Sequence, residues 1–87
     1  MFYILVYDVN VSRVQKMLKL IRGYLNHVQN SVFEGELTDA QLEELKYKIK
    51  KLMVSEEDSV IIYCLGSSRY YNREVLGVEK SSSDQFV

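Results

Sequence analysis

The sequence contains almost no cysteine: Cys64 is the single one in 87 residues. An intrachain disulfide is therefore excluded, and so is a zinc or iron–sulfur site built from several cysteines. One thiol within an apolar segment fits a protein of a reducing compartment, and we expect Cys64 to be an inert core side chain.

Long apolar runs are lacking as well. The two longest cover residues 2–7 and 60–65, and both are far too short to span a bilayer. The first residues show neither the basic stretch nor the small-residue cleavage site of a secretory signal. We therefore expect a cytoplasmic protein that has no membrane partner.

The sequence has no excess of positive charge, because its formal net charge is −1. Dedicated nucleic-acid-binding proteins are usually basic overall, so any phosphate contact would have to come from a local patch. A glycine-rich phosphate loop, a Ser/His/Asp set and an RNA-recognition aromatic motif are all missing. The sequence thus gives no support for those three kinds of site.

Enough apolar residues are present for one folded domain, and their pattern predicts the order βαββαβ. The hydrophobic share of 47 % excludes wholesale disorder. Segments 2–7 and 60–65 are apolar on both faces, as expected for central strands. Helices are predicted to begin at Ser12 and Thr38, each followed three residues later by the glutamine of a capping box. A hairpin with its turn at 30–31 separates the two helices.

These elements predict an α+β fold of the ferredoxin-like βαββαβ kind, with an antiparallel sheet and an extra strand within residues 72–79. Right-handed crossovers place the two apolar strands side by side in the middle of the sheet, and both helices cover one face. The other face is still apolar, so we expect a second copy to bury it in a homodimer. We assign residues 1–79 to this domain and residues 80–87 to a flexible tail. Phe86 and Val87 suit docking onto another protein, although a frayed terminus is the alternative.

Asp8 is the candidate catalytic and metal-binding residue. It follows a central strand close to the expected two-fold axis, so a dimer would bring two such carboxylates together. Mg²⁺ prefers carboxylate oxygens and keeps several waters. The alternative is an ordinary turn-forming aspartate. His27, Glu34 and Glu36 lie near the hairpin, but their spacing is not that of a metal site.

Four cations lie outside the apolar stripe of the predicted first helix: Arg13, Lys16, Lys19 and Arg22. We predict that they bind nucleic acid. The alternative is that they form a solvated helix face with no ligand.

Three stretches together resemble the CRISPR-associated protein two family, and the resemblance covers nearly the whole chain. Residues 29–37 read Q-N-S-V-F-E-G-E-L, residues 7–9 read Y-D-V at the end of the first strand, and residues 58–63 read D-S-V-I-I-Y. The first two at this distance are fairly specific, whereas Y-D alone after a strand would carry no weight.

The resemblance implies a ferredoxin-like homodimer whose last strand crosses to the partner's sheet. It further implies a metal-dependent endonuclease that uses Mg²⁺ or another divalent cation on single-stranded RNA or duplex DNA. The family's metal-binding Asp maps onto Asp8, and its supporting aromatic residues map onto Tyr7 and Phe33. Its first-helix cations map onto Arg13 and Lys16. Many relatives carry Arg at the position of His27, where a neutral His would weaken a grip on phosphate.

The same resemblance implies a role in spacer acquisition, in which the dimer bridges copies of the CRISPR integrase and carries duplex DNA on basic residues. Asp8 is not needed for that role, so a non-catalytic DNA-binding scaffold in the same complex is the alternative. The integrase is also the implied partner of the tail, which family members use for this contact. Two weaker possibilities are a VapD-like toxin ribonuclease and a small regulatory domain that binds a metabolite at its dimer interface.

Overall fold

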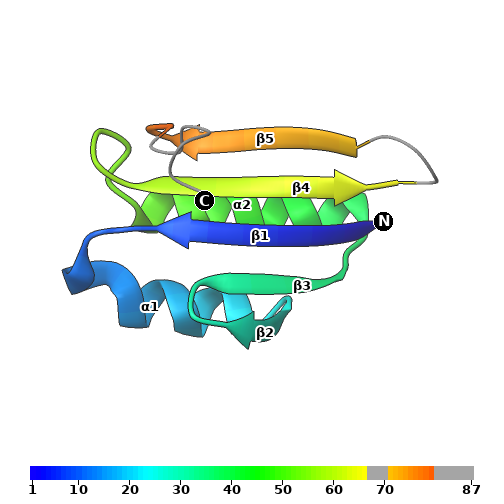
Figure 1. Ribbon diagram of the computed structural model, residues 1–87, viewed down its shortest axis with the longest axis horizontal. Coiled ribbons are helices and arrows are strands. Elements are labelled where there is room, and N and C mark those ends of the chain that lie inside the picture. Colours follow the sequence, from blue (N-terminus) through cyan, green and yellow to red (C-terminus); the bar gives the residue numbers. More distant parts are fainter. Residues whose placement is uncertain (67–70, 80–87) are drawn as a thin grey trace.

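Seven elements follow one another in the order that the sequence predicts, including the extra strand at the end. The computed structural model describes residues 1–66 and 71–79. Within these ranges the elements are β1 (Phe2–Asp8), α1 (Val11–Arg22), β2 (Asn26–Gln29), β3 (Val32–Glu36), α2 (Asp39–Leu52), β4 (Ser59–Leu65) and β5 (Tyr71–Gly77). The strands form one sheet in the order β2-β3-β1-β4-β5 (Figure 1). All of its pairs are antiparallel. The ferredoxin-like α+β fold is therefore confirmed.

β1 lies in the middle of the sheet, between β3 and β4, so the two apolar strands are neighbours as expected. Side chains alternate between the faces of a strand, and the burial of β1 follows this period. Tyr3, Leu5 and Tyr7 are buried, whereas Ile4 and Val6 on the opposite face are half-buried. The sheet thus has one deeply covered face and one apolar face that no helix of the described residues covers.

Both helices cover the same face of the sheet. α1 buries Met17 and Ile21, and α2 buries Leu45 and Ile49, all within the hydrophobic cluster that contains Leu5. Full burial of one such aliphatic side chain stabilises the fold by about 1.5–3 kcal/mol. Both helices therefore pack on one face of the sheet, and neither of them covers the opposite face.

One of the two expected helix starts is confirmed and the other is wrong. The Thr38 hydroxyl accepts the Gln41 N–H at 3.1 Å, and the Gln41 side chain accepts the Thr38 N–H at 2.9 Å. At α1, however, Asn10 is the N-cap rather than Ser12. The Asn10 Oδ1 atom accepts the Ser12 N–H at 2.9 Å and the Ser12 hydroxyl at 2.8 Å. Because Asn10 is the cap, the helix begins at Val11, one residue before Ser12.

The hairpin turn at residues 30–31 is confirmed. Asn30 adopts a left-handed conformation with φ 46°, which Asn tolerates better than most residues. β5 begins one residue earlier and ends two residues earlier than expected, and it pairs with β4 of its own chain from Leu65↔Tyr71 to Ser59↔Gly77. A crossing of the last strand to a partner stays a prediction.

The predicted tail of residues 80–87, with the docking residues Phe86 and Val87, lies outside the described residues. Neither helix of the described ranges is both long and apolar enough to cross a membrane.

Candidate functional site

Asp8 is the last residue of β1, and its side chain is exposed. By strand alternation it belongs to the face opposite the helices, and it pairs in register with Ser59 of β4. A hollow of about 350 Å³ surrounds this end of the strand. It is lined by Tyr7, Asp8, Val9, Val14, Asn30 and Ser31. The end of β1, the start of α1 and the hairpin turn therefore meet at the candidate residue.

The described residues of one chain do not form a complete metal site around Asp8. Among the described residues, no three His, Cys, Asp or Glu side chains gather closely enough to hold an ion. His27, Glu34 and Glu36 therefore do not join Asp8 in a cluster. Mg²⁺ is commonly held by only one or two carboxylates, with waters and phosphate oxygens as its other ligands. Asp8 fits as one such carboxylate, and a second copy of the chain would supply another.

The two predicted supporting residues lie against each other beneath this site. The rings of Tyr7 and Phe33 stack with centroids 5.9 Å apart, and the His27 ring stacks on Phe33 at 4.8 Å. Tyr7 and Phe33 are buried, and burial raises the pKa of the Tyr7 hydroxyl. The His27 Nε2 atom lies 2.6 Å from the Asn30 carbonyl oxygen. These three rings tie the end of β1 to the hairpin.

Arg13 is engaged with carboxylates of the α2–β4 loop. Its Nε atom donates to Asp58 Oδ2 at 2.6 Å, and its Nη2 atom donates to Asp58 Oδ1 at 3.0 Å and to Glu57 Oε1 at 2.9 Å. The Asp58 side chain is completely buried, and it also accepts the backbone N–H groups of Asn10 at 3.0 Å and Val54 at 2.9 Å. Arg13 thus has a structural partner, and its binding to nucleic acid stays a prediction.

The Asp58 carboxylate is held in its charged form. The hydrogen bonds from Arg13, together with those from the Val54 and Asn10 backbone, lower the pKa of Asp58 from 3.8 to about 2, although burial opposes the shift. The same contact raises the pKa of Arg13. Sequence reasoning missed this residue because it stands in an acidic loop that looks exposed. The one available signal is its position directly before a wholly apolar strand.

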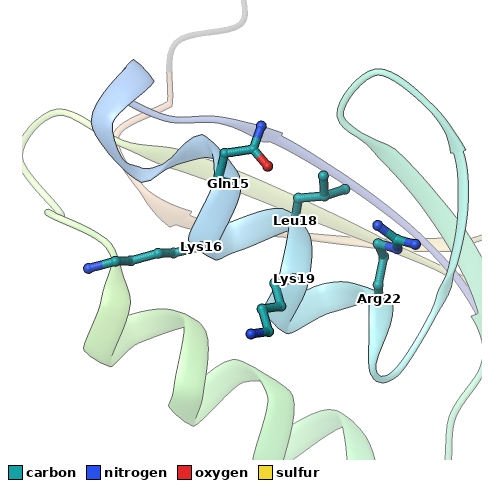
Figure 2. A pocket seen from close by; sticks show the side chains of 5 residues that line it. All are labelled: Gln15, Lys16, Leu18, Lys19 and Arg22. Carbon is teal, nitrogen blue, oxygen red and sulfur yellow. The ribbon is translucent and has the colours of Figure 1, made fainter.

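The other three predicted cations of α1 share one surface. Lys16, Lys19 and Arg22 are exposed and, with Gln15 and Leu18, line a hollow of about 460 Å³. Figure 2 shows that their charged ends fan out from the helix instead of meeting at one point. Such an arrangement suits several successive phosphates better than a single small anion.

The fold and site define a small ferredoxin-like protein with a solvent-facing carboxylate at the end of its central strand and a cationic first helix. A family model described as "CRISPR associated protein Cas2" matches residues 1–73. The CRISPR-associated endoribonuclease Cas2 of Thermotoga maritima is 49 % identical over 87 residues, covering 100 % of this chain and 99 % of that protein. Its namesake from Dictyoglomus turgidum is 46 % identical and covers 100 % of both chains.

Solved structures that are similar to this chain are also Cas2 proteins. A crystal structure of Cas2 is similar with a TM-score of 0.73 at 49 % identity, over 94 % of this chain and 92 % of the other. The structure of Streptococcus pyogenes Cas2 at pH 6.5 gives a TM-score of 0.71 at 32 % identity, over 78 % and 89 %. The chain therefore belongs to the CRISPR associated protein Cas2 family, and the predicted resemblance is confirmed.

Proposed function

We propose that this protein is a CRISPR-associated endonuclease that hydrolyses phosphodiester bonds with a divalent cation, Mg²⁺ by preference, held by Asp8. The observation that carries the proposal is the exposed Asp8 carboxylate in a hollow at the end of β1. RNA is the first candidate substrate, because the curated relatives are named endoribonucleases. Duplex DNA is the second candidate, because Lys16, Lys19 and Arg22 of α1 can bind the phosphates of DNA as well as those of RNA.

The proposed site needs two chains. Asp8 projects from the sheet face that no described helix covers, and a homodimer through that face brings two Asp8 carboxylates near its two-fold axis. A bound Mg²⁺ supplies activation of water and neutralises the charge that develops on a phosphodiester. Asp8 contributes a carboxylate oxygen to its binding, and the stacked rings of Tyr7 and Phe33 keep the end of β1 in place.

Replacing Asp8 tests the proposal directly. We expect Asp8→Asn to lower the rate of RNA cleavage about a hundredfold or more, because loss of a metal ligand removes several kcal/mol of transition-state stabilisation. Purified protein would be incubated with single-stranded RNA or duplex DNA in Mg²⁺ or in EDTA. Asp39→Asn is the matched control, because it removes the same charge at a distant place. Asp39 is the first residue of α2, which follows β3 close to the start of β1, whereas Asp8 is at the end of β1. Cleavage by Asp8→Asn at the wild-type rate would refute the role of Asp8.

The second candidate function is a non-catalytic scaffold that carries duplex DNA and bridges the CRISPR integrase during spacer acquisition. The fan of Lys16, Lys19 and Arg22 on α1 favours it, because spread cations can follow a phosphate backbone. Phe86 and Val87 stay the predicted contact with the integrase. Membership of the Cas2 family favours both of these functions over a VapD-like toxin.

Salt dependence tests the scaffold function. Each phosphate contact contributes about 0.9 to the slope of log affinity against log salt concentration. We therefore expect the double variant Lys16→Gln/Lys19→Gln to bind duplex DNA with a slope reduced by about 1.8. Lys50→Gln/Lys51→Gln, which removes two exposed cations from α2, is the control. Equal slopes for the two double variants would show that α1 is not the DNA-binding element.

A further inference from the structure

We propose that Asp58 is the positioning residue of the Asp8 site, an inference that rests on the proposed function. Asp58 stands where four segments meet. Its carboxylate accepts from the β1–α1 turn, from α1 and from its own α2–β4 loop, through Asn10, Arg13 and Val54. Its backbone carbonyl accepts the Val78 N–H, just beyond β5, at 2.9 Å. No other described acid combines complete burial with partners from so many elements.

The connection from Asp58 to Asp8 is short and passes through the backbone. Asp8 pairs in register with Ser59, the residue after Asp58. Two residues beyond Asp8, the Asn10 N–H donates to Asp58 Oδ1 at 3.0 Å. Val9, the residue between them, is buried. The turn that begins at Asp8 is therefore held at both of its ends by two adjacent residues, Asp58 and Ser59, at the start of β4.

The contacts of Asp58 also determine where β1 ends and where α1 begins. The Asn10 side chain caps α1 while its N–H binds Asp58. Arg13 donates to both Asp58 oxygens, through Nε and Nη2, and these two bonds restrain rotation of the carboxylate. A displacement of about 1 Å at a reacting centre can cost a hundredfold in rate. An exposed Asp8 that must share an ion with a second chain needs such a rigid attachment.

Asp58→Asn tests the inference, because the amide keeps an oxygen for the Asn10 N–H but loses the charge and one acceptor. We expect kcat for RNA cleavage to fall about tenfold to a hundredfold while KM stays within about twofold. We also expect weaker Mn²⁺ binding to the nucleic-acid-free protein, measured by electron paramagnetic resonance. Backbone hydrogen exchange at Val9 and Asn10 should become roughly tenfold faster. All measurements are made under conditions in which urea titration shows each variant to be fully folded.

Lys46→Gln is the matched control for the loss of a partly buried ion pair. The Lys46 side chain is 13 % exposed and joins Glu74 of β5 at 2.9 Å and Glu43 at 3.3 Å. We expect this variant to lose stability but to keep the wild-type kcat, Mn²⁺ affinity and exchange at Asn10. If Lys46→Gln lowered kcat as much as Asp58→Asn does, Asp58 would be a stabilising residue only, and the inference would be wrong.

A second pair of variants isolates the backbone contact without changing Asp58. Asn10 has φ −56°, which proline adopts. Asn10→Ala and Asn10→Pro both remove the side-chain cap, but only proline removes the N–H that binds Asp58. We expect Asn10→Pro to lower kcat and Mn²⁺ affinity well below Asn10→Ala, and Asp58→Asn to add little in the Asn10→Pro background. Equal behaviour of the alanine and proline variants would overturn the inference.

Failure of the proposed function would look different. If the wild-type protein neither cleaves nucleic acid nor binds Mn²⁺, the proposed function fails. The catalytic part of the inference then fails with it. Exchange at Val9 and Asn10 in Asp58→Asn still decides whether Asp58 holds the turn: faster exchange supports that structural role, and unchanged exchange overturns it as well.

Discussion

Asp58 carries a charge whose stabilising effect depends on pH in the acid range. Its pKa is about 2 in the folded protein, below the ordinary value of 3.8. A lowered pKa stabilises the fold above pH 3.8, and this stabilisation is lost as the pH falls from about 4 through 2. The shift corresponds to about 2 kcal/mol in the free energy of unfolding.

The wild-type protein should therefore have a higher free energy of unfolding than Asp58→Asn, and we expect this difference to be larger at pH 7 than at pH 2. Urea titrations at pH 7, 5, 3 and 2 would measure both proteins. The difference between them should shrink between pH 4 and pH 2. A difference that stays constant over this range would mean that the ion pair with Arg13 contributes nothing through its charge.

Single residues differ in how well the sequence predicts their place. Asp8 is predicted as a site residue because it ends an apolar strand, which is local information, whereas Tyr7 and Phe33 are predicted only through the family resemblance. Asp58 was missed because its partner Arg13 is 45 residues away in the chain. Only the packing of α1 against the α2–β4 loop brings the two together, and no pattern within either segment records that contact.

Among the elements, β5 depends on a glycine at its last residue. Gly77 has φ 84°, and a Cβ atom there would overlap the Asp58 carbonyl oxygen and the Met53 side chain. We expect Gly77→Ala to lower the free energy of unfolding by about 1–3 kcal/mol or more, because both the conformation and the space are unsuitable.

Gly23→Ala provides the comparison for that variant. Gly23 has φ −73° at the end of α1, and an added Cβ would come no closer than 3.4 Å to the Leu20 carbonyl oxygen. We expect this change to be neutral or slightly stabilising. Thermal unfolding of the two variants should therefore separate clearly, and equal melting temperatures would contradict the account of Gly77.

The helices and strands can be predicted from the hydrophobic period and the turn residues of the sequence. Their first and last residues are predicted less well. The sequence predicts Ser12 as the cap of α1, whereas the structure has the cap at Asn10. The choice falls on Asn10 because its N–H also binds Asp58, a tertiary contact. Likewise, the length of β5 is set by its register with β4, which no short stretch of sequence encodes.

At the scale of the whole molecule, the sheet face opposite the helices predicts the homodimer. Ile4 lies on that face and is only half-buried in one chain. We expect Ile4→Glu to yield monomers, because burying an unpaired carboxylate in an interface costs several kcal/mol. Static light scattering at micromolar concentration would measure the mass.

Tyr47→Glu on α2 is the control, because Tyr47 is 62 % exposed on the helical layer. It should leave the dimer intact. Dissociation of Tyr47→Glu with retention of the Ile4→Glu dimer would place the interface on the helices instead of the sheet.

The central position of β1 also governs how the protein is made. One edge of β1 pairs with β3. The other edge pairs with β4, which is synthesised later, so that Phe2 lies opposite Leu65. While the ribosome is still translating the second half, the nascent chain carries an apolar strand with one edge unpaired. Such edges recruit foreign strands. We therefore expect the sheet to close only after β4 has left the exit tunnel, and a ribosome that stalls before that point to leave an aggregation-prone fragment.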